Sequence, residues 1–157
     1  MNSLAEKMGE MFGGTQQLRF QVLEMLTDQD LQFAVTGNPT LGALFRQEGE
    51  FEHAYAESFK TLRMDFSYRH ADAAVETSVE ALKSWFRSID AALMAAINAF
   101  SEADLQARQI DRGGWMAPLA LQADVYIQAL LICFGKVSVY LRAMGKPLPQ
   151  QWNEWIG

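Results

Sequence analysis

The sequence predicts an all-α protein, a four-helix bundle with a short C-terminal tail, built as a single domain over residues 1–157. Two observations lead to this prediction. Four long segments place hydrophobic residues three, four or seven positions apart, which keeps them on one helical face. No segment of useful length shows the alternation of apolar and polar residues that a β-strand requires. Four such helices bury their apolar faces most simply against one another, and a chain of this length can enclose a substantial core.

The first helix is predicted to begin at Ser3, where Ser3 and Glu6 have the spacing of a capping box. Its apolar positions recur as far as Leu26. Gly13 and Gly14 interrupt this pattern, and each glycine costs a helix about 1 kcal/mol relative to alanine. Two alternatives follow: a kink or split with a new start at Thr15, or a frayed first turn.

The second helix is predicted to begin after Thr40, a suitable N-cap that follows the break at Thr36–Pro39. Its apolar positions extend to Leu62. The polar stretch Asp65–Ala74 is predicted to be a loop.

The third helix is predicted to begin near Thr77–Glu80, again at a capping-box spacing, and to extend to about Phe100. The polar stretch Ser101–Gly114 is predicted to be a loop over one end of the bundle.

The fourth helix is predicted to begin near Met116–Pro118 and to end at Met144, because Gly145 favours a helix C-terminus. In the tail, Trp152 and Trp155 are three residues apart, and they are expected to dock on the bundle or to pack against a partner subunit.

Charge and composition restrict the possible partners. The formal net charge is −6, and the 13 basic residues are not clustered, which argues against nucleic-acid binding. The apolar stretch Met116–Phe134 is interrupted by Gln122, Asp124 and Gln128, so a buried helix is favoured over a membrane span. The N-terminus lacks the pattern of a signal peptide, and the single cysteine, Cys133, fits a reducing compartment. We therefore expect a cytoplasmic protein without membrane partners.

Three stretches carry a pattern that extends over most of the chain. They are Leu23–Leu31 (LEMLTDQDL), Thr40–Tyr55 (TLGALFRQEGEFEHAY) and Gly135–Pro149 (GKVSVYLRAMGKPLP). These stretches resemble the end of helix one, the start of helix two and the end of the last helix in the DinB-like (DinB/YfiT) four-helix bundle superfamily. The resemblance implies that fold for this chain.

In metal-binding members of that superfamily, one histidine on helix two and two histidines four apart on the last helix hold a divalent ion. The resemblance places these positions at Gln47, Ala129 and Cys133. Alanine cannot bind a metal, and one thiolate does not build a site. The resemblance therefore implies a chain without the metal, and we expect no metal ion and no cofactor.

Five residues are expected to line what remains of this site: Gln47, Glu48, Ala129, Cys133 and Tyr126. Glu48 lies within an apolar stripe, so it requires a partner or a raised pKa, unless the helix is rotated enough for it to reach solvent. Arg142 and Lys136 are the candidate partners from the fourth helix. Cys133 lies among apolar residues and is expected to be structural.

An alternative metal site is also considered. If the alignment of the helices is wrong by one turn, Glu48, His53 and Asp124 form a possible ligand set, and Glu50 stands three residues before His53. Histidine and carboxylate side chains are suitable ligands for divalent metals.

Two functions remain open from the sequence. The first is a metal-free bundle that binds a small molecule or a protein, with a homodimer expected through the last helix or the tail. The second is a divergent enzyme of the hydrolase or thiol-transferase class that uses Gln47, Glu48 and Cys133.

Overall fold

A computed structural model describes residues 1–157 and contains four long helices. They are α1 (Ser3–Met25), α2 (Leu41–Thr61), α3 (Val79–Asn98) and α5 (Leu119–Ala143). The predicted all-α four-helix architecture is confirmed, and each predicted helix matches one of these four to within a few residues.

Short elements connect the long helices. They are the 3-10 turns η1 (Asp30–Gln32) and η2 (Ala73–Thr77), the helices α4 (Glu102–Ala107) and α6 (Gln150–Trp155), and the strands β1 (Gln109–Asp111) and β2 (Met116–Pro118). The stretch 101–114, predicted as a loop, thus contains α4 and β1.

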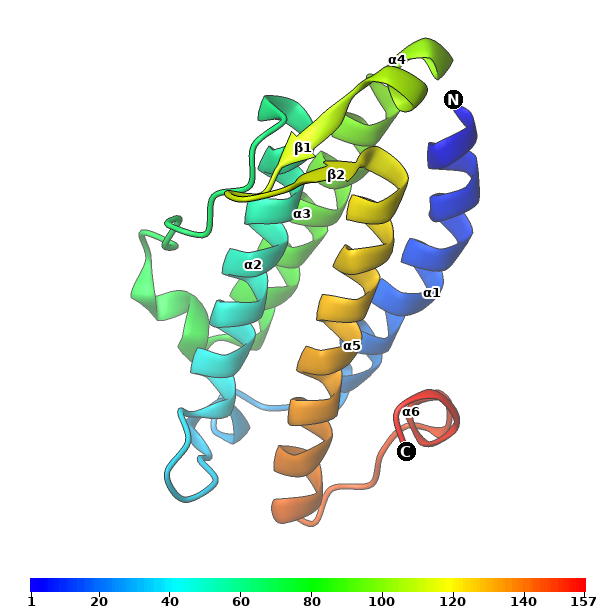
Figure 1. Ribbon diagram of the computed structural model, residues 1–157. Helices are drawn as coiled ribbons and strands as arrows, with labels where there is room; N and C mark the ends of the chain where they lie inside the picture. Colours follow the sequence, from blue (N-terminus) through cyan, green and yellow to red (C-terminus); the bar gives the residue numbers. More distant parts are fainter.

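The four long helices form a ring in which α1 and α2 lie diagonally opposite each other (Figure 1). α2 packs against α3 and α5, and α1 packs against the same two helices. Because each helix has two neighbours, its apolar face is turned inward, and 34 buried hydrophobic residues form one continuous core.

Polar caps fix where three of the helices begin. The side chain of Asn2 accepts a hydrogen bond from the amide of Ala5, Thr40 does the same for Ala43, and Ser78 for Ala81. Each cap satisfies one backbone donor that the first turn of a helix leaves free. The Thr40 cap matches the prediction, whereas the caps of α1 and α3 lie at neighbouring residues of those predicted.

α1 is one continuous helix from Ser3 through Gly13 and Gly14, so the split with a new start at Thr15 does not occur and the first turn is formed. Met8 and Phe12 are buried on one side of the glycines, and Leu18 and Val22 on the other. Packing of this face on the core outweighs the low helix propensity of two glycines.

The β-hairpin formed by β1 and β2 is the element that the sequence did not predict. Ile110 pairs with Ala117, and both side chains are buried. Each strand has three residues, too few to show a period of two. The hairpin lies across the ends of α2 and α5 (Figure 1).

The turn between α2 and α3 comes close to the start of α2. A Cβ atom built on Gly42 would lie 1.8 Å from the backbone oxygen of Glu76. A side chain cannot fit in this space, which gives a physical reason for glycine in the Thr40–Leu41–Gly42 stretch.

By length and composition α5 could cross a membrane, but half of its most apolar window is buried inside the bundle. The sequence favoured a buried helix for this segment, and in the structure α5 packs against α1 and α2.

The C-terminal helix α6 docks beside α1 and α5 (Figure 1). The Trp152 side chain is fully buried, packs against Phe134, and donates an indole hydrogen bond of 2.7 Å to the carbonyl of Leu18. Trp155 remains 53% exposed, although its ring reaches Gly14. The tail is thus attached to its own bundle through one of the two tryptophans.

Trp152→Ala is expected to lower the free energy of unfolding by about 3–5 kcal/mol, because it removes a fully buried ring and leaves a cavity. Trp155→Ala is the matched control, and its cost should stay below about 1 kcal/mol. Urea titrations of both variants measure this difference. Equal losses would contradict the attachment of the tail through Trp152.

Candidate functional site

A group of charged side chains lies at the centre of the bundle. Arg19 of α1 is fully buried, and its guanidinium group contacts three carboxylates, Glu48 and Glu52 of α2 and Asp90 of α3. We call these four residues the core charge cluster. Its geometry connects three of the four long helices.

The three carboxylates differ in how they meet Arg19. Asp90 accepts two hydrogen bonds from Nη2, at 2.8 and 2.9 Å, and Glu52 accepts one from Nη1. Glu48 lies 3.6 Å from Nη1 and accepts no hydrogen bond. Arg19 is also stacked over the ring of Phe86, with its Cζ atom 3.9 Å from the ring centre.

α5 joins the cluster through Tyr126. The buried Tyr126 hydroxyl donates a hydrogen bond of 2.8 Å to Glu52, and it accepts one of 3.1 Å from the amide of Gln16. The Tyr126 hydroxyl therefore has both a hydrogen-bond acceptor and a donor in the core. Through this bond all four long helices contribute to a single polar network.

Burial and charge change the proton affinities in the cluster. Burial works against the charged form of Arg19, but attraction to Glu52 and the other carboxylates outweighs it and raises the arginine's pKa. Arg19 therefore stays charged. Burial raises the pKa of Asp90 to about 6, against the opposing attraction of Arg19.

Glu48 is a second carboxyl whose pKa is raised by its surroundings. Its side chain is 1% exposed. Burial, and next the repulsion from Glu52, raise its pKa well above the usual value despite the attraction of Arg19. Both of its oxygens lack a hydrogen-bond partner. Glu48 is thus a buried acid whose hydrogen-bonding capacity is unused.

Glu48 is one of the residues that line a small crevice between α2 and α5, which we call the Glu48 crevice. Its free space is about 10 Å³, about the room of one water molecule. Eight residues line it: Glu48, Phe51, Glu52, Tyr55, Tyr126, Ala129, Leu130 and Cys133. Phe51 and Ala129 are half-buried and form its outer edge.

The crevice brings together four of the five residues expected to line the site, Glu48, Ala129, Cys133 and Tyr126. Gln47 lies elsewhere. It is exposed, and it borders a shallow hollow with Arg46, Glu50 and Arg69. One residue along a helix is a rotation of about 100°, so Gln47 and Glu48 cannot face the same way.

The sequence predicted Lys136 or Arg142 as the partner of Glu48, and the structure places neither beside it. Its nearest cation is Arg19 of α1, whereas Lys136 is exposed on α5 and Arg142 bonds to the carbonyl of Gly157 near the C-terminus. Glu48 does not reach solvent either. Arg19 is the partner because α1 and α2 face each other across the core of the bundle.

Cys133 lies on the inner side of α5 and is buried. Burial, and next the negative charge of Glu48, raise its pKa to about 12. At neutral pH the side chain is therefore a thiol rather than the nucleophilic thiolate.

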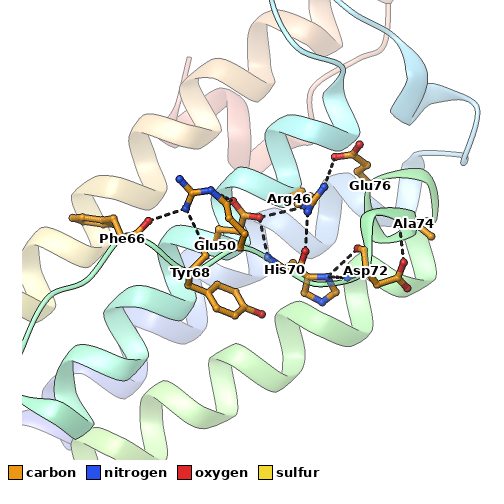
Figure 2. Close-up of polar contacts among 9 residues, drawn as sticks. Arg46, Glu50, Phe66, Tyr68, His70, Asp72, Ala74 and Glu76 are labelled. Atoms are coloured by element: carbon orange, nitrogen blue, oxygen red, sulfur yellow. Dashed lines mark hydrogen bonds and ion pairs between the residues drawn. The ribbon is translucent and has the colours of Figure 1, made fainter.

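The alternative ligand set is not brought together. Glu50 anchors the loop after α2: it lies 3.3 Å from Arg46 and accepts a hydrogen bond of 3.0 Å from the amide of His70 (Figure 2). His53 stacks on Tyr68 at the surface, with the ring centres 3.7 Å apart. Figure 2 shows that this polar network joins α2 to the loop, with Arg46 also donating to the carbonyl of His70 at 2.7 Å.

The residues present do not form the three-histidine site that metal-binding members of the DinB-like superfamily have. Across residues 1–157 no three histidine, cysteine or carboxylate side chains are placed to hold one ion. The carboxylates that converge in the core are instead held by Arg19, a cation that belongs to the chain itself.

Sequence reasoning missed Arg19, Glu52 and Asp90. The sequence does indicate that Arg19 is buried. It lies on the same helical stripe as the apolar residues Met8, Phe12 and Val22. A charged residue in an apolar stripe requires an opposite charge on a facing helix. Glu48 and Glu52, four residues apart, provide it.

The arrangement of the four long helices is that of a DinB-like four-helix bundle fold. The structure is similar to that of a DinB-like protein, YjoA from Bacillus subtilis, with a TM-score of 0.66 and 15% sequence identity. The match covers 94% of this chain and 96% of the other. No protein-family model matches the sequence, and no curated protein does. The likeness confirms the predicted fold.

Glu48→Gln should change how stability depends on pH. In the folded chain Glu48 keeps its proton, whereas in the unfolded chain it releases the proton above its ordinary pKa. The proton on Glu48 therefore stabilises the folded chain at low pH. As pH rises, this stabilisation is lost, and the free energy of unfolding falls by about 1.4 kcal/mol per pH unit until the raised pKa is reached. Glutamine carries no such proton.

Urea titrations between pH 6.5 and 8.5 measure this effect, because Asp90 contributes mainly below its pKa of about 6. The wild type should lose stability over this range more steeply than Glu48→Gln. Glu80→Gln, at a side chain that is 78% exposed, is the control and should follow the wild type. Parallel curves for all three proteins would show that Glu48 is ionised in the folded state.

Proposed function

We propose that this chain is a metal-free DinB-like binding module, which takes a small molecule into the Glu48 crevice. The observation that carries the proposal is Glu48 itself, a buried carboxyl with no hydrogen bond that faces a crevice. An unsatisfied buried polar group costs about 1–3 kcal/mol, so the chain bears a cost that a ligand would remove.

The lining of the crevice supports a binding role. Phe51, Tyr55 and Tyr126 provide aromatic surface, and Glu48 provides one polar anchor. Pockets for small molecules are commonly built from apolar walls with a few polar groups that orient the ligand. Cys133 is a protonated thiol, so it lines the crevice without acting as a nucleophile.

Arg19 supports the metal-free part of the proposal. It neutralises part of the negative charge that would otherwise attract a divalent ion, and it does so with hydrogen bonds to Glu52 and Asp90. The remaining side chains at the crevice, Ala129 and Cys133, do not form a ligand set.

Ala129→Phe tests the location of the site, because a large ring at the outer edge fills the crevice. Small organic cations, neutral amides and carboxylic acids are screened by thermal shift. Compounds that raise the melting temperature of the wild type should have little effect on this variant, since only ligands of the folded state stabilise it. Met11→Phe, at a side chain of α1 that is 43% exposed, is the control and should keep the response.

Two results would contradict the proposal. The first is that none of these compounds stabilises the wild type, or that those which do stabilise Ala129→Phe equally well. The second concerns metals: zinc, nickel or manganese bound near one equivalent, with a rise in melting temperature, would overturn the metal-free part.

We also propose a homodimer formed through α5. Ile132 and Val139 are 62% and 52% exposed, and their spacing of seven residues places them on one face. Exposed apolar side chains on one helix face are typical of a protein contact, and the exposed Lys136 lies between these two.

Ile132→Lys should shift the protein to a smaller species in sedimentation experiments, because a charge in an apolar contact is costly. Gln17→Lys, at an exposed position of α1, adds the same charge elsewhere and should leave the sedimentation coefficient unchanged. A wild type that sediments as a monomer at high concentration would sink this idea.

A further inference from the structure

The core charge cluster contains more negative than positive groups. One guanidinium group, that of Arg19, faces three carboxyl groups. Asp90 and Glu52 take up its hydrogen bonds, and Glu48 is left at 3.6 Å. The other groups that face Glu48 are the Tyr126 hydroxyl and the Cys133 thiol, while Lys136 of α5 remains exposed. The cluster can therefore accommodate one more positive charge, next to Glu48.

The shape of the crevice limits what can bring that charge. Its free space of about 10 Å³ matches a group the size of water. An –NH₃⁺ group is of this size. It carries three N–H donors, and the two oxygens of Glu48 have no hydrogen-bond donor in the structure. Anions are disfavoured by the nearby carboxylates Glu48 and Glu52, and an apolar group would leave Glu48 unsatisfied.

The walls also suit a cation. The rings of Phe51, Tyr55 and Tyr126 border the space. Aromatic faces attract ammonium ions, more strongly when water is excluded. The side chain of Ala129 at the outer edge is small, which leaves a way out for the carbon atom attached to the ammonium head.

We propose that the Glu48 crevice binds the head of a primary ammonium ion, R–NH₃⁺, which donates hydrogen bonds to the carboxylate of Glu48. This inference rests on the proposed function and names its ligand class. The exchange is balanced: the carboxyl of Glu48 releases one proton to solvent, and the ammonium ion takes its place as the positive partner. Arg19, Glu52 and Asp90 keep their hydrogen bonds.

The exchange of a proton for a cation has a measurable consequence. While the folded protein holds a proton on Glu48, each rise of one pH unit should strengthen ammonium binding about tenfold. The ligand itself stays protonated over this range, so the change reports on the protein.

The test uses the full chain and methylammonium chloride, with potassium chloride at equal ionic strength as the reference. Binding is followed by the chemical shifts of backbone amides on α2 and α5. We expect saturable shifts around Glu48 and Ala129, with a dissociation constant about tenfold lower at pH 7.5 than at pH 6.5. Calorimetry in two buffers should show the release of about one proton for each ion bound.

The variants separate this inference from the proposed function. Glu48→Gln keeps the shape of the crevice and should weaken methylammonium binding at least tenfold, whereas Glu80→Gln should not. Equal shifts in methylammonium and potassium chloride, or binding that persists in Glu48→Gln, would overturn the inference. If a neutral amide or a carboxylic acid bound instead, and Ala129→Phe blocked it, the binding module would stand and the ammonium ligand would be wrong.

Discussion

The contact between Arg19 and the carboxylates of α2 and α3 is the interaction on which the rest of the structure depends. The two helices that lie diagonally opposite in the bundle, α1 and α2, meet through it across the core. A buried guanidinium group is tolerated only when its charge and its donors are matched, and removal of one partner leaves an uncompensated charge. The geometry of Glu52 and Asp90 therefore fixes the rotation of three helices about their axes, because another rotation would leave Arg19 without acceptors.

The same contact explains the properties of Glu48. Arg19 donates its hydrogen bonds to Glu52 and Asp90, and Glu48 stays 3.6 Å away. The attraction of Arg19 is therefore too weak to offset burial, which raises the pKa of Glu48. Glu48 also bears on the neighbouring thiol of Cys133. The thiol of Cys133 is less acidic because of burial, and the negative charge of Glu48 when ionised adds to this effect. The crevice is thus suited to hydrogen bonding and to cations rather than to attack by a thiolate.

The helices were predictable because their signal is local. The apolar spacing of α2 and α3 and the Thr40 cap are set by residues a few positions apart. The hairpin was not, because Ile110 is buried by contacts with distant parts of the chain. For Trp152 the sequence left two alternatives, docking on the bundle or packing against a partner subunit, and the choice depends on a distant contact, the hydrogen bond to Leu18. Arg19 belongs to the second kind, since its role appears only when the carboxylates of two other helices are placed beside it.

Glu48 and Gln47 show how far a motif can locate a site. The pattern Thr40–Tyr55 predicted the right helix and pointed to Gln47 and Glu48 together, of which Glu48 is buried and Gln47 is exposed. The apolar stripe of Leu41, Leu44 and Phe45 continues to Glu48 and Glu52, and the side chains of this stripe meet Ala129 and Cys133 on α5. A helix of 3.6 residues per turn separates neighbouring side chains by about 100°, so the face of the helix is a stricter guide than alignment to a loose motif. For a bundle that shares its fold with a relative at 15% identity, the chemistry has to be argued from the side chains that face the core, because the fold by itself does not specify them.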